Sequence, residues 1–185
     1  MNLHPQQVSI PSEPVPAQPE LDEVARLWLG GGLTINKHPG ESTREEMLAA
    51  VDSTKLPTQD VDKAANAFYH KVTVPVELLR SITLRLSEMF KRCSIILSGH
   101  FEYPKNGYMG WHTNSSAEGL RLYAAYATGQ SGFRYVDGAG RVVDSTDLPG
   151  WNFRLFSIRP DAPLWHSVWA ESPRLSIGFR IINNL

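Results

Sequence analysis

The sequence predicts a mostly β protein with helices in its N-terminal part, built as an antiparallel barrel or sandwich supported by those helices. Two observations carry this prediction. Between Leu21 and Arg92, apolar residues recur at three- and four-residue steps, which is typical of amphipathic helices. From Cys93 onward, short apolar or alternating runs stand between turn residues, which is typical of strands in a sandwich or barrel.

Three helices are expected before the strand-rich part of the chain. The run LDEVARLWLG, residues 21–30, is a short amphipathic helix ended by glycines. Ser42 and Glu45 fit a capping box that opens a second helix over residues 42–51. The third helix candidate, residues 74–93, is the longest. Its apolar residues recur at three- and four-residue steps, so one face of it should lie on an apolar surface. These residues are Val76, Leu79, Ile82, Leu86 and Met89.

Eight strand candidates follow over about residues 94–183, separated by breakers such as TGQSG, DLPG and RPDAP. The clearest hairpin is FRYVDGAGRVV, in which two β-rich arms flank the turn at residues 137–140. The strand candidates are CSIILSG, GYMGWHTN, GLRLYAAYAT, GFRYVD, GRVVDS, WNFRLFSIR, LWHSVWA and RLSIGFRII.

The N-terminal segment differs from the rest. Residues 1–20 contain five prolines, which favour an extended, flexible arm over a helix or strand. We therefore expect this arm to be followed by a single domain over residues 21–185, a length sufficient for one hydrophobic core.

Composition narrows the function classes. Eighteen Lys and Arg against 19 Asp and Glu give a net charge of −1, so no nucleic-acid partner is expected. Cys93 is the single cysteine, which excludes an intramolecular disulfide and a cysteine-cluster zinc site and favours a reducing compartment. No apolar run approaches the ~20 residues that span a bilayer. We expect a soluble, cytoplasmic protein without a membrane partner.

The alternation of side chains along strands groups several polar residues. His112 and Asn114 share one face of their strand. On the last strand, one face carries Arg174, Ser176 and Arg180, whereas the opposite face is apolar, with Leu175, Ile177 and Phe179. If the apolar face lies on the helices, the polar face must line a cavity or meet water.

The order of these residues resembles a known pattern. His112-Thr113-Asn114 is followed by His166 and then by Arg174-Leu175-Ser176. An H-x-(D/E) pair, a second histidine some fifty residues later, and R-x-S on the next strand are the pattern of the Fe(II)/2-oxoglutarate-dependent dioxygenases, which the chain resembles over roughly residues 94–183. The resemblance implies a double-stranded β-helix, or jelly roll, buttressed by helices on its N-terminal side.

The resemblance also implies a cofactor set and the residues that hold it. The cofactors would be Fe(II), 2-oxoglutarate and O2, with His112 and His166 as iron ligands and Asn114 in the third position. Arg174 and Ser176 would hold the distal carboxylate of 2-oxoglutarate, since a guanidinium binds a carboxylate in a bidentate manner.

Two further residues are candidates for the cosubstrate or substrate pocket. Alternation places Arg121 and Tyr123 on one face of the run GLRLYAAYAT.

Asn114 departs from the family, in which an Asp or Glu stands at this position. A neutral amide binds Fe(II) less tightly than a carboxylate does. Asn114 could ligate the metal directly, could orient a water, or could leave room for a halide, as in the family's halogenases. Alternatively, the iron chemistry could be lost, or Glu118 could supply the carboxylate.

The expected function is therefore a 2-oxoglutarate-dependent hydroxylase of a small molecule or of a polar protein side chain, which converts 2-oxoglutarate to succinate and CO2. Two alternatives remain at this point. One is a cupin-like pseudoenzyme that binds a metal or ligand without turnover, and the other is a structural jelly roll that assembles through its strands.

Overall fold

A computed structural model describes residues 7–11, 15–56 and 66–183 of the chain. Within these residues the elements are the helices α1 (Gln18–Leu29), α2 (Arg44–Ala50) and α3 (Val76–Met89), the short 3-10 helix Ser53–Lys55, and the strands β1 (Val8–Ser9), β2 (Thr34–Asn36), β3 (Ala67–Phe68), β4 (His70–Thr73), β5 (Cys93–Tyr103), β6 (Gly107–His112), β7 (Gly119–Ala127), β8 (Ser131–Val136), β9 (Val142–Thr146), β10 (Gly150–Ile158), β11 (His166–Ala170) and β12 (Arg174–Asn183). No helix in the described ranges has the length and apolar character required to cross a membrane.

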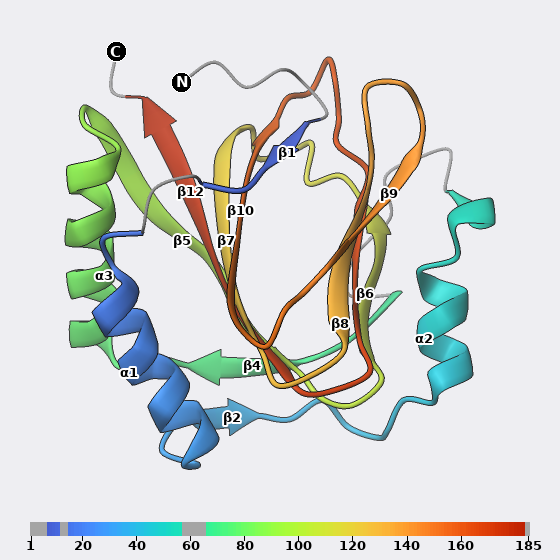
Figure 1. Ribbon diagram of the computed structural model, residues 1–185, viewed down its shortest axis with the longest axis horizontal. Helices are drawn as coiled ribbons and strands as arrows, with labels where there is room; N and C mark the ends of the chain where they lie inside the picture. Colours follow the sequence, from blue (N-terminus) through green and yellow to red (C-terminus); the bar gives the residue numbers. More distant parts are fainter. Residues whose placement is uncertain (1–6, 12–14, 57–65, 184–185) are drawn as a thin grey trace.

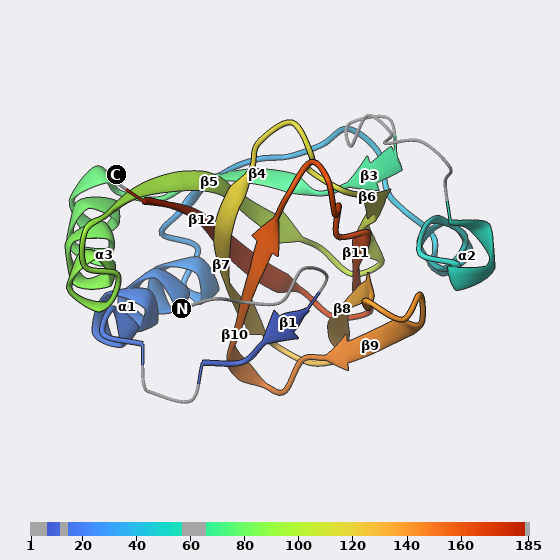
Figure 2. The same ribbon diagram turned by 90° about the horizontal axis from the view of Figure 1, so that it is seen from above.

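The strands form two antiparallel sheets that face each other as a jelly-roll-like sandwich (Figures 1 and 2). The larger sheet has the order β1-β10-β7-β12-β5-β4-β2, and the smaller has the order β3-β6-β11-β8-β9. From β5 to β8 the chain alternates between the sheets, and it alternates again from β9 to β12. The prediction of a mostly β sandwich is confirmed.

The eight strand candidates of the sequence correspond to β5 through β12. The hairpin prediction is also correct, because β8 pairs with β9 from Val136↔Val142 onward and the turn between them includes Gly140 at φ 76°. A positive φ suits glycine, which has no Cβ to clash with the backbone.

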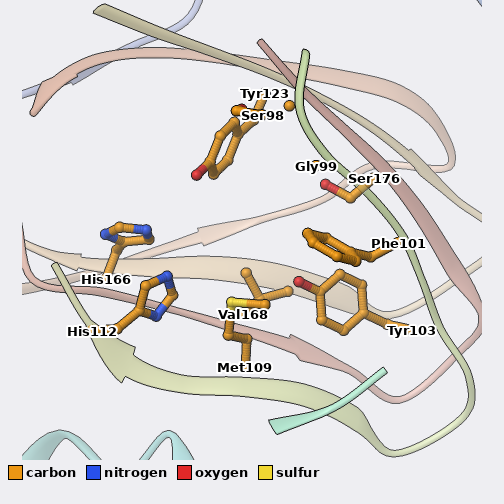
Figure 3. Close-up of a pocket in the computed structure, with 11 residues that line it drawn as sticks. Ser98, Gly99, Phe101, Tyr103, Met109, His112, Tyr123, His166, Val168 and Ser176 are labelled. Carbon is orange, nitrogen blue, oxygen red and sulfur yellow. The ribbon is translucent and has the colours of Figure 1, made fainter. Parts of the chain in front are cut away.

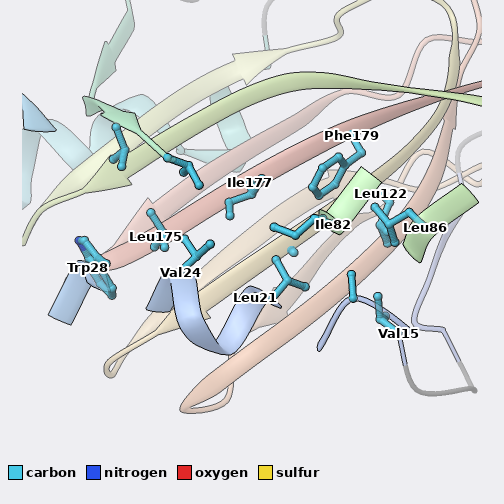
Figure 4. Packing of buried hydrophobic residues seen from close by; sticks show 14 of the residues in the cluster. Val15, Leu21, Val24, Trp28, Ile82, Leu86, Leu122, Leu175, Ile177 and Phe179 are labelled. Carbon is cyan, nitrogen blue, oxygen red and sulfur yellow. The ribbon is translucent and has the colours of Figure 1, made fainter. Parts of the chain in front are cut away.

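A first apolar core lies between the larger sheet and the helices α1 and α3 (Figure 4). The predicted apolar face of β12, formed by Leu175, Ile177 and Phe179, is buried here against side chains such as Leu21 and Ile82. Because side chains alternate along a strand, this contact turns the polar face of β12 toward the smaller sheet.

A second apolar core lies between the two sheets. It contains side chains from both inner faces, including Tyr103 of β5, Met109 of β6, Phe133 of β8, Phe156 of β10 and Val168 of β11. The interior of the sandwich is therefore packed, and polar side chains inside it occupy a confined space.

Three local expectations are corrected. Helix α1 begins at Gln18, so residues 18–20 belong to its first turn and not to the arm, and Pro19 is tolerated there because the first helical N–H groups have no intrahelical acceptor. The capping box of α2 is formed by Thr43 and Glu46, one residue later than expected. Val76 at the start of α3 is 58% exposed, and the buried residues of that helix are Ile82 and Leu86.

The proline-rich arm is described only in part, since residues 1–6 and 12–14 lie outside the described residues. Where it is described, β1 pairs with β10 in the register Val8↔Phe156 and Ser9↔Leu155. This part of the segment therefore adds an edge strand to the larger sheet.

Candidate functional site

Two buried histidines meet inside the sandwich. His112 ends β6, His166 begins β11, and the two residues are direct partners in the antiparallel pairing of these strands. Directly opposed residues of an antiparallel pair project to the same face, so both rings point between the sheets. Their ring centroids lie 4.1 Å apart.

A carbonyl fixes the protonation of each ring. Nδ1 of His112 lies 2.8 Å from the carbonyl oxygen of Gly110, and Nδ1 of His166 lies 2.9 Å from that of Leu164. Because a carbonyl oxygen only accepts, each Nδ1 carries the proton and donates it. In the neutral rings the lone pair is then on Nε2, which is the form that ligates a metal.

Asn114 joins the pair from the turn after β6. It is buried, and its backbone adopts the left-handed region at φ 59°, which asparagine tolerates better than most residues. Its amide Nδ2 lies 3.1 Å from Nε2 of His166, to which it donates a hydrogen bond. The structure thus brings together the three residues that the resemblance implies as metal ligands.

A carboxylate does not complete this cluster in the described part of the chain, where no group of three His, Cys, Asp or Glu side chains could hold a metal. Glu118 is exposed, and its backbone carbonyl accepts a hydrogen bond from Nε of Arg180 at 2.7 Å. The structure does not bring the carboxylate of Glu118 to the two histidines.

The histidines border a pocket with a cavity volume of about 40 Å³ (Figure 3). Tyr123 points its phenol oxygen toward His166, and Ser176, Phe101 and Tyr103 lie toward the other end of the pocket. Burial raises the pKa of both tyrosines, so both phenols are neutral hydrogen-bonding groups.

Arg174, on the inner face of β12, lies next to the ring of Tyr103. Its guanidinium carbon is 5.5 Å from the centroid of the Tyr103 ring, and its side chain is buried. Nε donates to Oδ2 of Asp147 at 2.8 Å, whereas the buried Nη1 has no hydrogen-bond partner among the described residues. A buried donor without an acceptor is energetically costly, so this nitrogen is suited to donate a hydrogen bond to a bound ligand.

The sequence analysis missed Asp147, which anchors Arg174. Its carboxylate accepts from Nε of Arg174, from Nη1 of Arg154 at 2.7 Å and from the hydroxyl of Ser131 at 2.7 Å. Burial acts to raise the pKa of Asp147, but the two arginines outweigh it and hold that pKa below its usual value. One carboxylate faces two guanidiniums, so this buried trio carries one uncompensated positive charge.

Asp147 was overlooked because DLPG has the composition of a surface turn, and no signal in the sequence pairs it with an arginine 27 residues away. A second omission is Phe133, whose ring stacks on His166 with centroids 5.2 Å apart and an interplanar angle of 26°. The sequence placed Phe133 on a strand, but alternation alone does not identify the ring that it covers.

The two pocket candidates on β7 lie at different places. Tyr123 borders the pocket and shares a hydrogen bond with Asn114. Arg121 is the cross-strand partner of Arg180, whereas Arg174 is the partner of Ala127 at the other end of β7. The structure therefore does not bring Arg121 to Arg174 and Ser176.

No family model matches the sequence, and no curated protein matches it. Among solved structures, a prolyl-4-hydroxylase from Pseudomonas putida is similar with a TM-score of 0.51 and 14% identity, over 96% of this chain and 92% of that one. At this identity the likeness concerns the fold alone.

Two further similar structures have lower scores. An oxidoreductase of the 2OG-Fe(II) oxygenase family from Burkholderia pseudomallei has a TM-score of 0.47 and 12% identity, over 94% of this chain and 93% of that one. The cupin domain of Drosophila melanogaster CENP-C has a TM-score of 0.39 and 14% identity, over 88% of this chain and 97% of that one.

Proposed function

We propose that the protein is an Fe(II)/2-oxoglutarate-dependent oxygenase of the double-stranded β-helix type, with α1 and α3 as buttresses. The observation that carries this proposal is the His112–His166 pair, two adjacent imidazoles that each donate Nδ1–H to a carbonyl, which is the tautomer that ligates a metal through Nε2. Two such imidazoles supply most of a facial site that leaves positions open for other ligands.

The residues present fit iron with one difference from the usual set. His112 and His166 would hold Fe(II), and Asn114, 3.1 Å from His166, would take the third position through its amide oxygen or through a water. The amide oxygen and nitrogen exchange places by a rotation of the side chain, so the same residue can donate to an imidazole or ligate a cation. When bound, Fe(II) would supply the oxidising chemistry with O2 and the 2-oxo acid.

Arg174 and Ser176 would orient the cosubstrate. The unpartnered Nη1 of Arg174 and the extra positive charge beside Asp147 favour an anion, and Ser176 lines the pocket on the same face of β12. The neutral phenol of Tyr103 would donate a further hydrogen bond to a carboxylate. Asp147 would keep the guanidinium in place, and the apolar walls at Phe101 and Val168 would exclude water.

The substrate would be a small molecule or a polar protein side chain, hydroxylated while 2-oxoglutarate is converted to succinate and CO2. The prolyl-4-hydroxylase with the similar fold, named for its action on proline, is consistent with a protein side chain. We further propose a cytoplasmic location and a single domain that includes all of α1 from Gln18 onward and follows the proline-rich arm.

The second candidate is a cupin-like module that binds a metal or ligand without turnover. The observation that favours it is Asn114, since a neutral third group weakens the site for Fe(II). Both candidates share the jelly-roll-like fold, so chemistry and not architecture separates them.

The deciding experiment measures succinate formed from 2-oxoglutarate by the full chain with Fe(II) under air, together with the iron content of the same sample. We expect succinate above the protein-free level, even without a substrate, and loss of it in His166→Ala. Bound iron without succinate, with or without added substrates, would favour the binding module. The absence of both iron and succinate would contradict the oxygenase and an iron-binding module alike.

A further inference from the structure

The inner face of β12 carries arginines at both ends. Its inward positions are Arg174, Ser176, Gly178 and Arg180, which pair with Ala127, Ala125, Tyr123 and Arg121 of β7, in that order. Arg121 and Arg180 thus lie two residues, or ~7 Å along the strands, beyond Tyr123, on the side away from Arg174. Since Tyr123 points to His166, the histidines lie between the two arginine sites.

The Arg121–Arg180 pair has no acidic partner among the described residues. Nη2 of Arg121 donates to the carbonyl of Ala117, and Nε of Arg180 donates to the carbonyl of Glu118. No ion pair involves either arginine in the part of the chain that the structure describes. Two adjacent like charges are therefore held by backbone carbonyls alone.

Arg121 is the more unusual of the two. It is 4% exposed, and its buried Nε has no hydrogen-bond partner among the described residues. Burial and the charge of Arg180 lower the pKa of its guanidinium, although Tyr123 acts in the opposite direction. A buried cation beside a second cation is unfavourable without an anion. The Arg174 site differs, because Asp147 lies there.

An apolar residue accompanies the pair. Ile96 of β5 is the cross-strand partner of Arg180, so both side chains project from the same face, and Ile96 is 48% exposed. An exposed isoleucine beside two guanidiniums fits a ligand with an acidic group and an apolar portion.

We propose that Arg121 and Arg180 bind a carboxylate of the substrate, so that the protein acts on an acid with an apolar portion near its carboxylate. That the ligand is the molecule oxidised rests on the proposed function, whereas the binding of a carboxylate does not. The acid enters from the side opposite Arg174, and its carboxylate is held ~7 Å along the strands from the level of Tyr123.

The test is isothermal titration calorimetry of the full chain with hexanoate and benzoate, using hexanamide and benzamide as neutral counterparts, without iron, 2-oxoglutarate or oxygen. We expect at least one acid to bind, its amide not to bind, and Arg180→Gln to weaken the acid about tenfold or more, as expected for loss of a charge-assisted contact. Arg141→Gln, at an exposed arginine of the β8–β9 turn, serves as the control and should leave this binding unchanged.

Each contrary result is decisive. Binding of neither acid, equal binding of acid and amide, or binding lost in Arg174→Gln and retained in Arg180→Gln overturns the proposal. Arg121→Gln is a second variant. Because Arg121 is buried and Arg180 is partly exposed, Arg180→Gln is less disruptive to folding. Circular dichroism checks that both variants are folded.

A further arm separates the two sources of the carboxylate. The probe is an acetylated hexapeptide with one central Asp and an amidated C-terminus. If it binds more tightly than both free acids, and Arg180→Gln weakens its binding, the natural ligand is an acidic protein side chain. Weaker binding than the free acids assigns a small acid. Because this titration uses no iron, absence of succinate formation in the enzyme assay would refute the oxygenase and leave the carboxylate site intact.

Discussion

His112 and His166 face each other across the β6–β11 pair, and each donates Nδ1–H to the carbonyl two residues before it, Gly110 in one case and Leu164 in the other. The same local device therefore fixes two rings from distant parts of the chain. Phe133 stacks on His166 and restricts it further. A site held in this way is organised before any ligand arrives.

The histidine pair predicts a spectroscopic signature. Under nitrogen, Fe(II) with 2-oxoglutarate should give a weak visible charge-transfer band in the wild type, and His166→Ala should abolish it because one of two imidazoles is lost. Absorption spectroscopy measures the band. His38→Ala, a change at an exposed histidine, is the control and should retain it. An unchanged band in His166→Ala would remove His166 from the site.

The unpartnered Nη1 of Arg174 predicts a binding defect. Arg174→Ala should weaken 2-oxoglutarate by at least ~1.5 kcal/mol, since a charge-assisted contact is lost. Calorimetric titration in the presence of Fe(II) under nitrogen gives the affinity. Arg141→Ala, at an exposed arginine of the β8–β9 turn, should bind 2-oxoglutarate like the wild type. Equal affinity in Arg174→Ala would place the acid elsewhere.

The amide of Asn114 predicts a gain of metal affinity on substitution. Asn114→Asp should tighten Fe(II) binding at least about tenfold, because a carboxylate adds one negative charge next to the imidazoles. Aspartate also tolerates the positive φ at this position, so the backbone should be retained. Competition with a chelator under nitrogen measures the affinity. Identical affinities in the two proteins would show that residue 114 does not reach the metal.

The buried trio around Asp147 predicts a large stability effect. Asp147→Asn leaves two buried guanidiniums without a carboxylate and should lower the free energy of unfolding by ~3–5 kcal/mol. Urea unfolding at pH 7 measures the change. Asp161→Asn, which breaks an exposed ion pair with Arg159, is the control and should have little effect. A loss no greater than that of Asp161→Asn would contradict this role.

The wild type and Asp147→Asn should also differ in the pH dependence of their free energy of unfolding. The pKa of Asp147 is depressed in the folded state, so its stabilising effect is complete above the unfolded value of about 3.9 and is lost as the pH falls through the folded value. The advantage of the wild type over Asp147→Asn should therefore be constant near neutral pH and shrink in acid. Urea unfolding repeated down to the acid limit of folding follows this difference.

Some of this protein could be deduced from sequence because the signals are local. Period-two alternation located β5 to β12, and the apolar residues of β12 predicted its buried face, because a strand with one apolar side must turn it to a core. The same alternation placed His112 with Asn114, and the resemblance paired them with His166. The capping box of α2 shifted by one residue because Ser42 and Thr43 both suit the position.

What the sequence alone determined is thus the strands β5 to β12, the polar and apolar sides of β12, and the residue types available for a metal and an acid; the strands β1 to β4 were not predicted. Only the tertiary structure decided which polar residues meet. Asp147 reaches Arg174 and Arg154 because the segment after β9 is folded against the inner face. Phe133 covers His166 because β8 lies beside β11. Arg121 meets Arg180 and not Arg174 because the β7–β12 register sets Arg121 and Arg180 opposite each other. Periodicity gives the direction of a side chain, whereas its partners depend on long-range pairing between strands, which no local pattern records.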